Sequence, residues 1–159
     1  MLTNPLSVSL SPPLPSSLRY RASHGALPLK WKPSAAALAQ KWCDKLVDER
    51  GGQLAHPEGK EETGKYMALE GRHLGQNLAM MTMKISDPEA FKQRRGKEYD
   101  AAVHKMVTLW YEEVHEYDFE KPTGFSARTG HFTQVVWKAT TEVGCGLSQV
   151  KGKAGSPYV

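Results

Sequence analysis

The chain has 159 residues and a mass of 17.7 kDa, and its 40% hydrophobic and 24% charged residues are typical of a globular domain rather than a disordered or fibrous chain. It contains no run of about 18 apolar residues of the kind that forms a membrane-spanning helix. The formal charge of +4 makes it mildly basic, and two cysteines, Cys43 and Cys145, are too few for a disulfide framework.

The N-terminal segment, "MLTNPLSVSLSPPLPSSL", is rich in Ser, Pro and Leu. A secretory signal needs a basic start and an uninterrupted apolar core, but no basic residue precedes Arg19 and prolines interrupt the apolar stretch. We therefore expect residues 1–18 to be a disordered leader and residues 19–159 to form one domain.

The first strong helical pattern covers residues 35–50, with Ser34 as the expected N-cap and Gly51-Gly52 as the stop. Residues 53–75 are a glycine- and charge-rich connection that carries His56. The following stretch, residues 76–85, fits either a helix or a strand.

A capping box at residues 86–89 predicts the start of another helix, which Gly96 should break. A basic cluster lies in this stretch: Lys92, Arg94, Arg95 and Lys97. A solvated helix face is the plainer interpretation, and a patch for anionic lipid is the alternative. Nucleic acid is disfavoured because no aromatic residues alternate with these charges.

Residues 98–119, "EYDAAVHKMVTLWYEEVHEYDF", give the clearest helical pattern of the chain. Its apolar stripe has helical spacing and comprises Val103, Met106, Val107, Trp110, Val114 and Tyr117. Glu113 lies at the border of that stripe, so its carboxylate either reaches water or is held by a partner.

The stretch "GHFTQVVWKATTEVGCG", residues 130–146, is predicted to be a strand, because Val135, Val136 and Trp137 are of the β-branched and aromatic types. This strand would open on His131, a polar ring that needs a partner if it is buried.

Four further stretches precede that segment in order: "YRASHGALPLKW", "LAHPEG", "GQNLAM" and "WYEEVHEYDF". Together they resemble the CAP superfamily (cysteine-rich secretory, antigen 5 and pathogenesis-related class 1 proteins; SCP domain), and most closely its compact, cysteine-poor Golgi-associated branch. The resemblance implies an α+β fold, a three-layer α-β-α sandwich, with an open cleft that carries two histidines and two acidic residues.

Carried onto this chain, the resemblance places His56 and His131 as ligands of a weakly bound divalent metal ion such as Zn²⁺. Glu113 takes one acidic position beside them, and Gln76 stands where the family usually has glutamate. Without the resemblance, His56 reads as an exposed loop residue, His131 as a hydrogen-bonded boundary residue and Glu113 as a surface acid.

The sequence also departs from the family pattern. Residues 87–102 are an insertion that we expect to form a helical excursion near the cleft. The proline-rich "SPPLPSS" stands where the first family helix should open, and "SPYV" comes before the family's second signature strand. The domain is therefore expected to be truncated at its first helix and last strand, which would leave Cys145 without its usual disulfide partner.

These features favour a non-enzymatic binding module for lipid, sterol or an anionic membrane surface, with no catalytic residue assigned. The alternatives are a metal-assisted hydrolase that uses His56, His131 and Glu113, and an inactive paralogue. No serine or cysteine nucleophile stands in a recognisable setting, which disfavours the hydrolase. As written, the chain is expected to stay inside the cell, with secretion, usual in the family, as the alternative.

Overall fold

The computed structural model describes residues 15–82, 88–122 and 125–150. Its helices are α1 (Pro15–Ser23), α2 (Pro33–Arg50), α3 (Gly59–Tyr66), α4 (Pro88–Glu112), the 3-10 helix η1 (Glu113–Glu116) and α5 (Gly130–Val135). Its strands are β1 (Lys30–Trp31), β2 (Ala68–Leu69), β3 (Arg72–His73) and β4 (Glu142–Val143).

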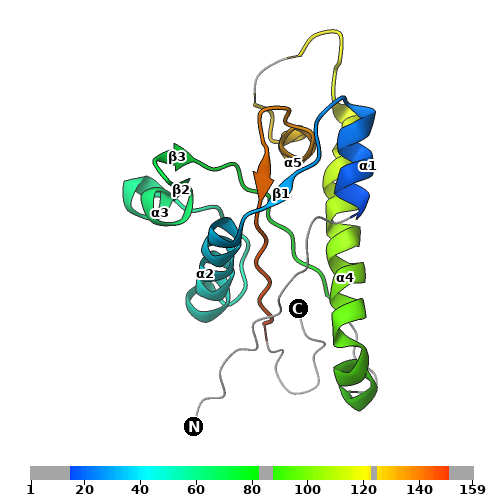
Figure 1. Ribbon diagram of the computed structural model, residues 1–159. Helices are drawn as coiled ribbons and strands as arrows, with labels where there is room; N and C mark the ends of the chain where they lie inside the picture. The colour runs from blue at the N-terminus through cyan, green and yellow to red at the C-terminus, as the bar shows by residue number, and fades with distance from the viewer. Residues whose placement is uncertain (1–14, 83–87, 123–124, 151–159) are drawn as a thin grey trace.

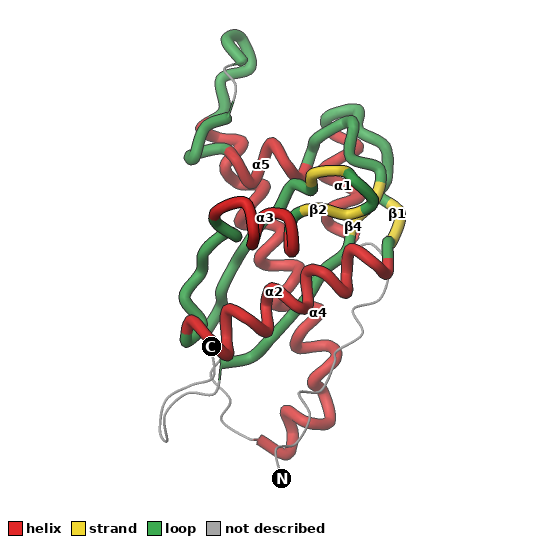
Figure 2. The backbone as a smooth tube through the Cα atoms, turned by 90° about the vertical axis from the view of Figure 1, so that its left-hand side faces the viewer, coloured by secondary structure: helices red, strands yellow, loops and turns green. Residues whose placement is uncertain are grey.

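The predicted α+β class is confirmed, with the helices arranged around small sheets. β1 pairs in parallel with β4, and β2 pairs antiparallel with β3. The β1–β4 pair lies between α2 with α3 on one side and α1 with α4 on the other (Figure 1). The view turned by 90° shows the same order, with α2 and α3 in front of the strands and α4 behind them (Figure 2).

α1 begins at Pro15, inside the segment predicted to be a disordered leader, so that prediction is wrong for residues 15–18. Proline is well suited to the first position of a helix, because its fixed φ matches the helix and its missing N–H is not needed there. α1 packs against α4 and α5. Residues 1–14 lie outside the described part of the chain.

α2 has the extent that its periodicity predicted, and Trp42 and Leu46 on its inner face are buried. The N-cap is Lys32 rather than the expected Ser34, because Pro33 already occupies the first helical position. Gly51 ends the helix in the left-handed conformation with φ +60°, which glycine adopts without steric cost.

α4 runs without a break through Gly96, so the predicted break there is wrong. An exposed glycine inside a helix costs about 1 kcal/mol relative to alanine. Burial of Tyr99, Val103 and Val107 on the inner face of α4 outweighs that cost. The insertion is thus helical, as expected, but it forms the end of α4 away from Glu113, not an excursion near the site residues (Figure 1).

The connection at residues 53–75 contains α3 and a hairpin of β2 and β3. Glu70 and Gly71 make the two-residue turn with φ of 52° and 75°. Two positive φ values match the turn type whose twist fits a tight hairpin. Residues 76–82 form neither the helix nor the strand that the sequence allowed, and residues 83–87, with Ser86 and Asp87 of the predicted capping box, lie outside the described part.

The predicted strand that opens on His131 is wrong, because residues 130–135 form the short helix α5. Both ends of α5 find partners from distant parts of the chain. A Glu113 carboxylate oxygen accepts a hydrogen bond from the Phe132 backbone N–H (3.0 Å), and the Arg21 guanidinium donates to the Val135 carbonyl (2.8 Å). These contacts satisfy groups that a helix leaves unpaired at its ends, and they outweigh the β-propensity of the valines.

Cys43 and Cys145 are both free thiols and half-buried. Burial raises the pKa of Cys43 to about 11, with smaller contributions from Asp44 and Cys145, and burial also raises the pKa of Cys145. No helix within the described ranges is long and apolar enough to span a membrane. The truncation expected at the last family strand concerns sequence that would follow Val159, so it stays a prediction.

Candidate functional site

Glu113 and His131 form the best-defined pair of the site. Glu113 is the first residue of η1, and one of its carboxylate oxygens lies 2.6 Å from the Nδ1 atom of His131. The other oxygen accepts the hydrogen bond of the Phe132 backbone. Because a carboxylate only accepts hydrogen bonds, Nδ1 of His131 is the donor in this contact, and Nε2 is the ring nitrogen that Glu113 does not engage.

Trp110 completes the surroundings of His131. Its indole stacks on the imidazole with 6.1 Å between ring centroids, and its Nε1–H donates to the Leu78 carbonyl at 3.1 Å. The His131 ring is therefore held by a carboxylate at its edge and by an aromatic face. Trp110 was predicted only as a member of the apolar stripe, and its contact with His131 was not anticipated.

His56 pairs with Gln76 in the same way, except that the partner is an amide. The Nδ1 atom of His56 lies 2.8 Å from Oε1 of Gln76. An amide oxygen accepts a hydrogen bond but carries no charge, so Gln76 orients the ring without adding electrostatic attraction for a cation. His56 is exposed, whereas the His131 side chain is 34% exposed.

Residues 75–77 connect the two pairs. Asn77 donates from Nδ2 to the His131 carbonyl at 3.1 Å. Gly75 lies so close to Gln134 of α5 that an added Cβ would be 1.9 Å from its Oε1 atom. Since Gln76 lies between them, the segment that holds His56 lies directly against the helix that carries His131. No role was predicted for Asn77, although its place beside Gln76 in "GQNLAM" was the available signal.

The donor set fits a weak metal site at most. Two imidazole rings, each oriented through Nδ1, leave two Nε2 atoms as potential ligands, and Gln76 and Glu113 are already engaged by the rings. Across the described ranges, no group of three or more His, Cys, Asp or Glu residues is placed to hold a metal ion. Two imidazole nitrogens are fewer ligands than a structural zinc site uses, and a metal ion held by His56 and His131 stays a prediction.

Two exposed aromatic side chains lie against the residues that flank His131 in the chain. Phe125 is 88% exposed, and its ring lies over Gly130, the residue before His131. Phe119 is 60% exposed, and its ring contacts the ring of Phe132, the residue after His131. Polar and apolar surface thus meet at the first turn of α5.

The basic cluster lies elsewhere, in the N-terminal half of α4, at the other end of that helix from Glu113 (Figure 1). Lys97 is exposed, and the side chains of Lys92, Arg94 and Arg95 lie outside what the structure describes. The prediction of a patch for anionic lipid at this cluster therefore stays a prediction.

Comparison with known proteins identifies relatives of the whole domain. The chain is 57% identical over 127 residues to Protein PRY2 of Saccharomyces cerevisiae, a match that covers 80% of this chain and 28% of that protein. It is 35% identical over 125 residues to Salivary antigen-5 of Dipetalogaster maximus, covering 79% of this chain and 42% of the relative. It is 30% identical over 141 residues to the human Golgi-associated plant pathogenesis-related protein 1, covering 88% of this chain and 71% of that protein.

The chain thus spans less than half the length of the first two of these relatives. The family model described as "Cysteine-rich secretory protein family" matches residues 19–158, which is most of the chain. The matched range includes every residue of the site described above. The chain therefore belongs to the CAP family.

Proposed function

We propose that the protein is a non-enzymatic binding module that takes an amphipathic lipid, a sterol or the surface of a membrane. The observation that carries the proposal is the exposure of Phe119 and Phe125, whose rings lie against Phe132 and Gly130, the residues on either side of His131 in the chain. Exposed aromatic rings next to fixed polar groups usually mark a surface that binds a partner.

The two kinds of surface suit the two parts of such a ligand. The apolar body would cover the rings of Phe119 and Phe125, and burial of apolar surface contributes about 25 cal/mol per Å². The polar head would face the imidazole of His131 and the carboxylate of Glu113, and this carboxylate would repel an anionic group. This arrangement favours a neutral or zwitterionic head, such as a sterol hydroxyl, over an anionic one.

A weakly bound divalent ion is the second part of the proposal. His56 and His131 would hold it through their Nε2 atoms, and Gln76 and Glu113 would orient the two rings. When bound, such an ion would supply a positive charge that attracts an oxygen of the ligand head. With two protein ligands, affinity should be modest and should fall in acid as the imidazoles protonate.

The proposal is tested by the binding of radiolabelled cholesterol and of phosphatidylcholine vesicles. Phe119→Ser with Phe125→Ser should remove most binding, because both apolar contacts are lost. Leu109→Ser is the matched control, since Leu109 is an exposed apolar residue of α4 (51%) that the proposal does not use. Equal binding by the parent and the phenylalanine variant would contradict the proposal, as would equal losses in the variant and the control.

A hydrolase remains a second candidate because Glu113 holds His131 at 2.6 Å, as an acid–base pair would require. In the described part of the chain, neither imidazole ring is hydrogen-bonded to a serine, threonine or cysteine side chain. Glu113→Gln should abolish any esterase or peptidase activity. Activity that survives this change would arise elsewhere and would remove the candidate.

A further inference from the structure

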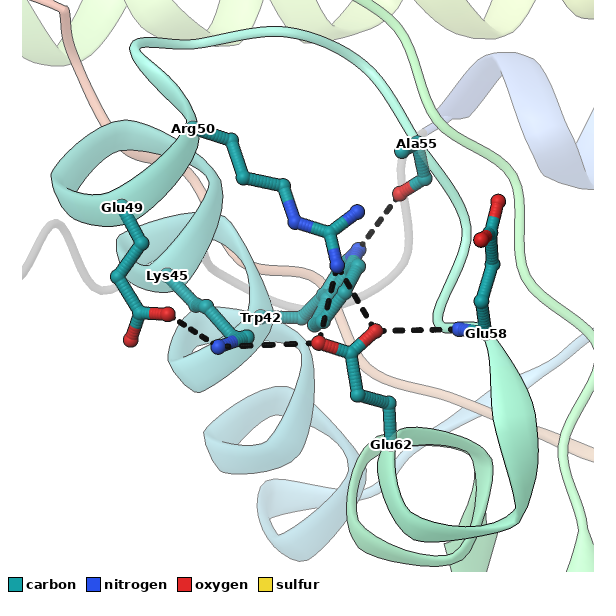
Figure 3. A network of polar contacts seen from close by, with 7 residues as sticks. All are labelled: Trp42, Lys45, Glu49, Arg50, Ala55, Glu58 and Glu62. Carbon is teal, nitrogen blue, oxygen red and sulfur yellow. Dashed lines mark hydrogen bonds and ion pairs between the residues drawn. The ribbon is translucent and has the colours of Figure 1, made fainter.

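A polar network at the junction of α2 and α3 surrounds the loop that carries His56 (Figure 3). The loop begins with Gly51 and Gly52, whose φ values are +60° and +83°. Two successive glycines give a backbone wide conformational freedom, so the loop does not fix the position of His56 by itself. Contacts on both sides of His56 restrict it instead.

On the N-terminal side of His56, the contact comes from Trp42 of α2. This indole is 1% exposed, and its Nε1–H donates a 3.1 Å hydrogen bond to the carbonyl of Ala55. Ala55 immediately precedes His56, so a buried and immobile ring fixes the backbone at that point.

On the C-terminal side, the contact comes from Glu62 of α3. Its carboxylate accepts a 3.1 Å hydrogen bond from the backbone N–H of Glu58, two residues after His56. That bond, followed by the hydrogen bond and charge of Arg50, lowers the pKa of Glu62 and keeps the carboxylate ionised at neutral pH.

Arg50, the last residue of α2, joins the two contacts. One guanidinium nitrogen lies 2.9 Å from each carboxylate oxygen of Glu62, and the guanidinium carbon lies 5.1 Å from the centre of the Trp42 ring. A hydrogen-bonded ion pair stacked on an aromatic ring combines directional bonds with a cation–π contact. Lys45 adds a further charge 3.7 Å from Glu62, and its other partner is Glu49.

We propose that Trp42, Arg50 and Glu62 form a loop clamp that positions His56 against Gln76 for ligand binding. The clamp holds the backbone on both sides of His56, while Gln76 holds the ring itself at 2.8 Å. The role of His56 as a ligand rests on the function proposed above, but the positioning can be measured without it. Trp42, Arg50 and Glu62 are positioning residues, because none of them contacts the His56 ring.

The test compares Glu62→Ala with Glu49→Ala. Both changes remove a carboxylate that pairs with Lys45, but Glu49 has no contact with the loop. Two readouts are used: the nuclear Overhauser contact between the His56 ring and the Gln76 side chain, and calorimetric titration with zinc. Thermal unfolding of each variant reports the purely structural effect.

The clamp predicts that Glu62→Ala loses the ring contact and weakens zinc binding by about tenfold, the lower end of the effect of residues that orient metal ligands. Glu49→Ala should keep both readouts at the parent level. Glu62→Gln should restore most of the contact, since its amide oxygen can still accept from the Glu58 N–H.

Retention of the ring contact in Glu62→Ala would overturn the proposal, as would an equal loss in Glu49→Ala. If the parent binds no zinc, the metal part of the proposed function fails. In that case the contact between the His56 ring and Gln76 is the only readout for the clamp. Loss of this contact in Glu62→Ala, with retention in Glu49→Ala, still supports the clamp. Retention of the contact in both variants refutes the clamp.

Discussion

Replacement of Arg21 by methionine should be among the most damaging single changes in this protein. The Arg21 side chain is completely buried. It donates hydrogen bonds to four backbone carbonyls, one shortly after α1 and three within residues 135–140. The acceptors, with their distances, are Leu27 (2.7 Å), Val135 (2.8 Å), Trp137 (3.1 Å) and Thr140 (2.9 Å). One guanidinium therefore joins α1 to the segment after α5.

The expected loss follows from the energy of these bonds. Hydrogen bonds of a charged group contribute about 1.5–3 kcal/mol each, so four of them represent about 6–12 kcal/mol. Methionine also removes the cost of burying a charge, which is several kcal/mol per ion and offsets more than half of that loss. We expect Arg21→Met to lower the free energy of unfolding by about 3 kcal/mol, or the melting temperature by about 6–12 °C for a chain of this size.

Urea unfolding followed by circular dichroism measures this change. Arg21→Lys should lose about half as much, because one ammonium group has three donors and cannot reach four carbonyls with the geometry of a guanidinium. Arg19→Met is the control, since Arg19 is an exposed residue of the same helix. A loss below about 1 kcal/mol for Arg21→Met would refute the reasoning, since that is the net value of a single ordinary hydrogen bond.

Three further predictions follow from the site and the thiols. Gly75→Ala should lower the free energy of unfolding by about 1 kcal/mol, because Gln134 must move away from the added methyl group; an unchanged urea midpoint would contradict the close contact. Gln76→Glu should tighten zinc binding by about tenfold in calorimetry, because a carboxylate on Nδ1 makes His56 a stronger ligand, and unchanged affinity would argue against His56 as a ligand. The pKa of Cys43 is about 11 in the folded protein against an ordinary 9.0, so the thiol should react with iodoacetamide at pH 8 about a hundredfold more slowly in the folded protein than in urea. The contribution of the buried thiol to stability should be lost as the pH rises from about 9 to 11. Equal reaction rates in the two states would contradict the burial.

The features that depend on neighbouring residues could be predicted from the sequence. α2 and its end at Gly51 follow from apolar periodicity and from a glycine at the stop. The helix around Val103 and Val107 was likewise predicted from the apolar periodicity of neighbouring residues, and both of these residues are buried. Ser34 was misjudged because α2 starts at Pro33, two residues earlier than expected, and Gly96 was misjudged because packing along α4 outweighs one glycine.

The character of α5 could not be predicted from its own residues. Val135 and Val136 favour a strand, and the groups that complete the helix lie far away in the chain. Arg21 is 114 residues from the carbonyl that it binds, and Glu113 is 19 residues from the amide that it binds. Interactions at that separation leave no periodic signal in the sequence.

The candidate site was predictable as a set of residues but not as pairs. Family resemblance selected His56, Gln76, Glu113 and His131 together. It gave no indication that each imidazole has its own partner, with Gln76 on His56 and Glu113 on His131. The border position of Glu113 on the apolar stripe left open whether a partner holds it, and the 2.6 Å contact with His131 answers that question.

Nuclear magnetic resonance mapping of a lipid titration tests the central claim most directly. The isotope-labelled parent protein is titrated with a short-chain phosphatidylcholine or a soluble cholesterol ester, and backbone and aromatic shifts are followed. The account predicts that Phe119, Phe125 and the first turn of α5, including His131, respond first and with one common affinity. It would be contradicted by shifts confined to α2 and α3, or by a response that leaves Phe119 and Phe125 unchanged.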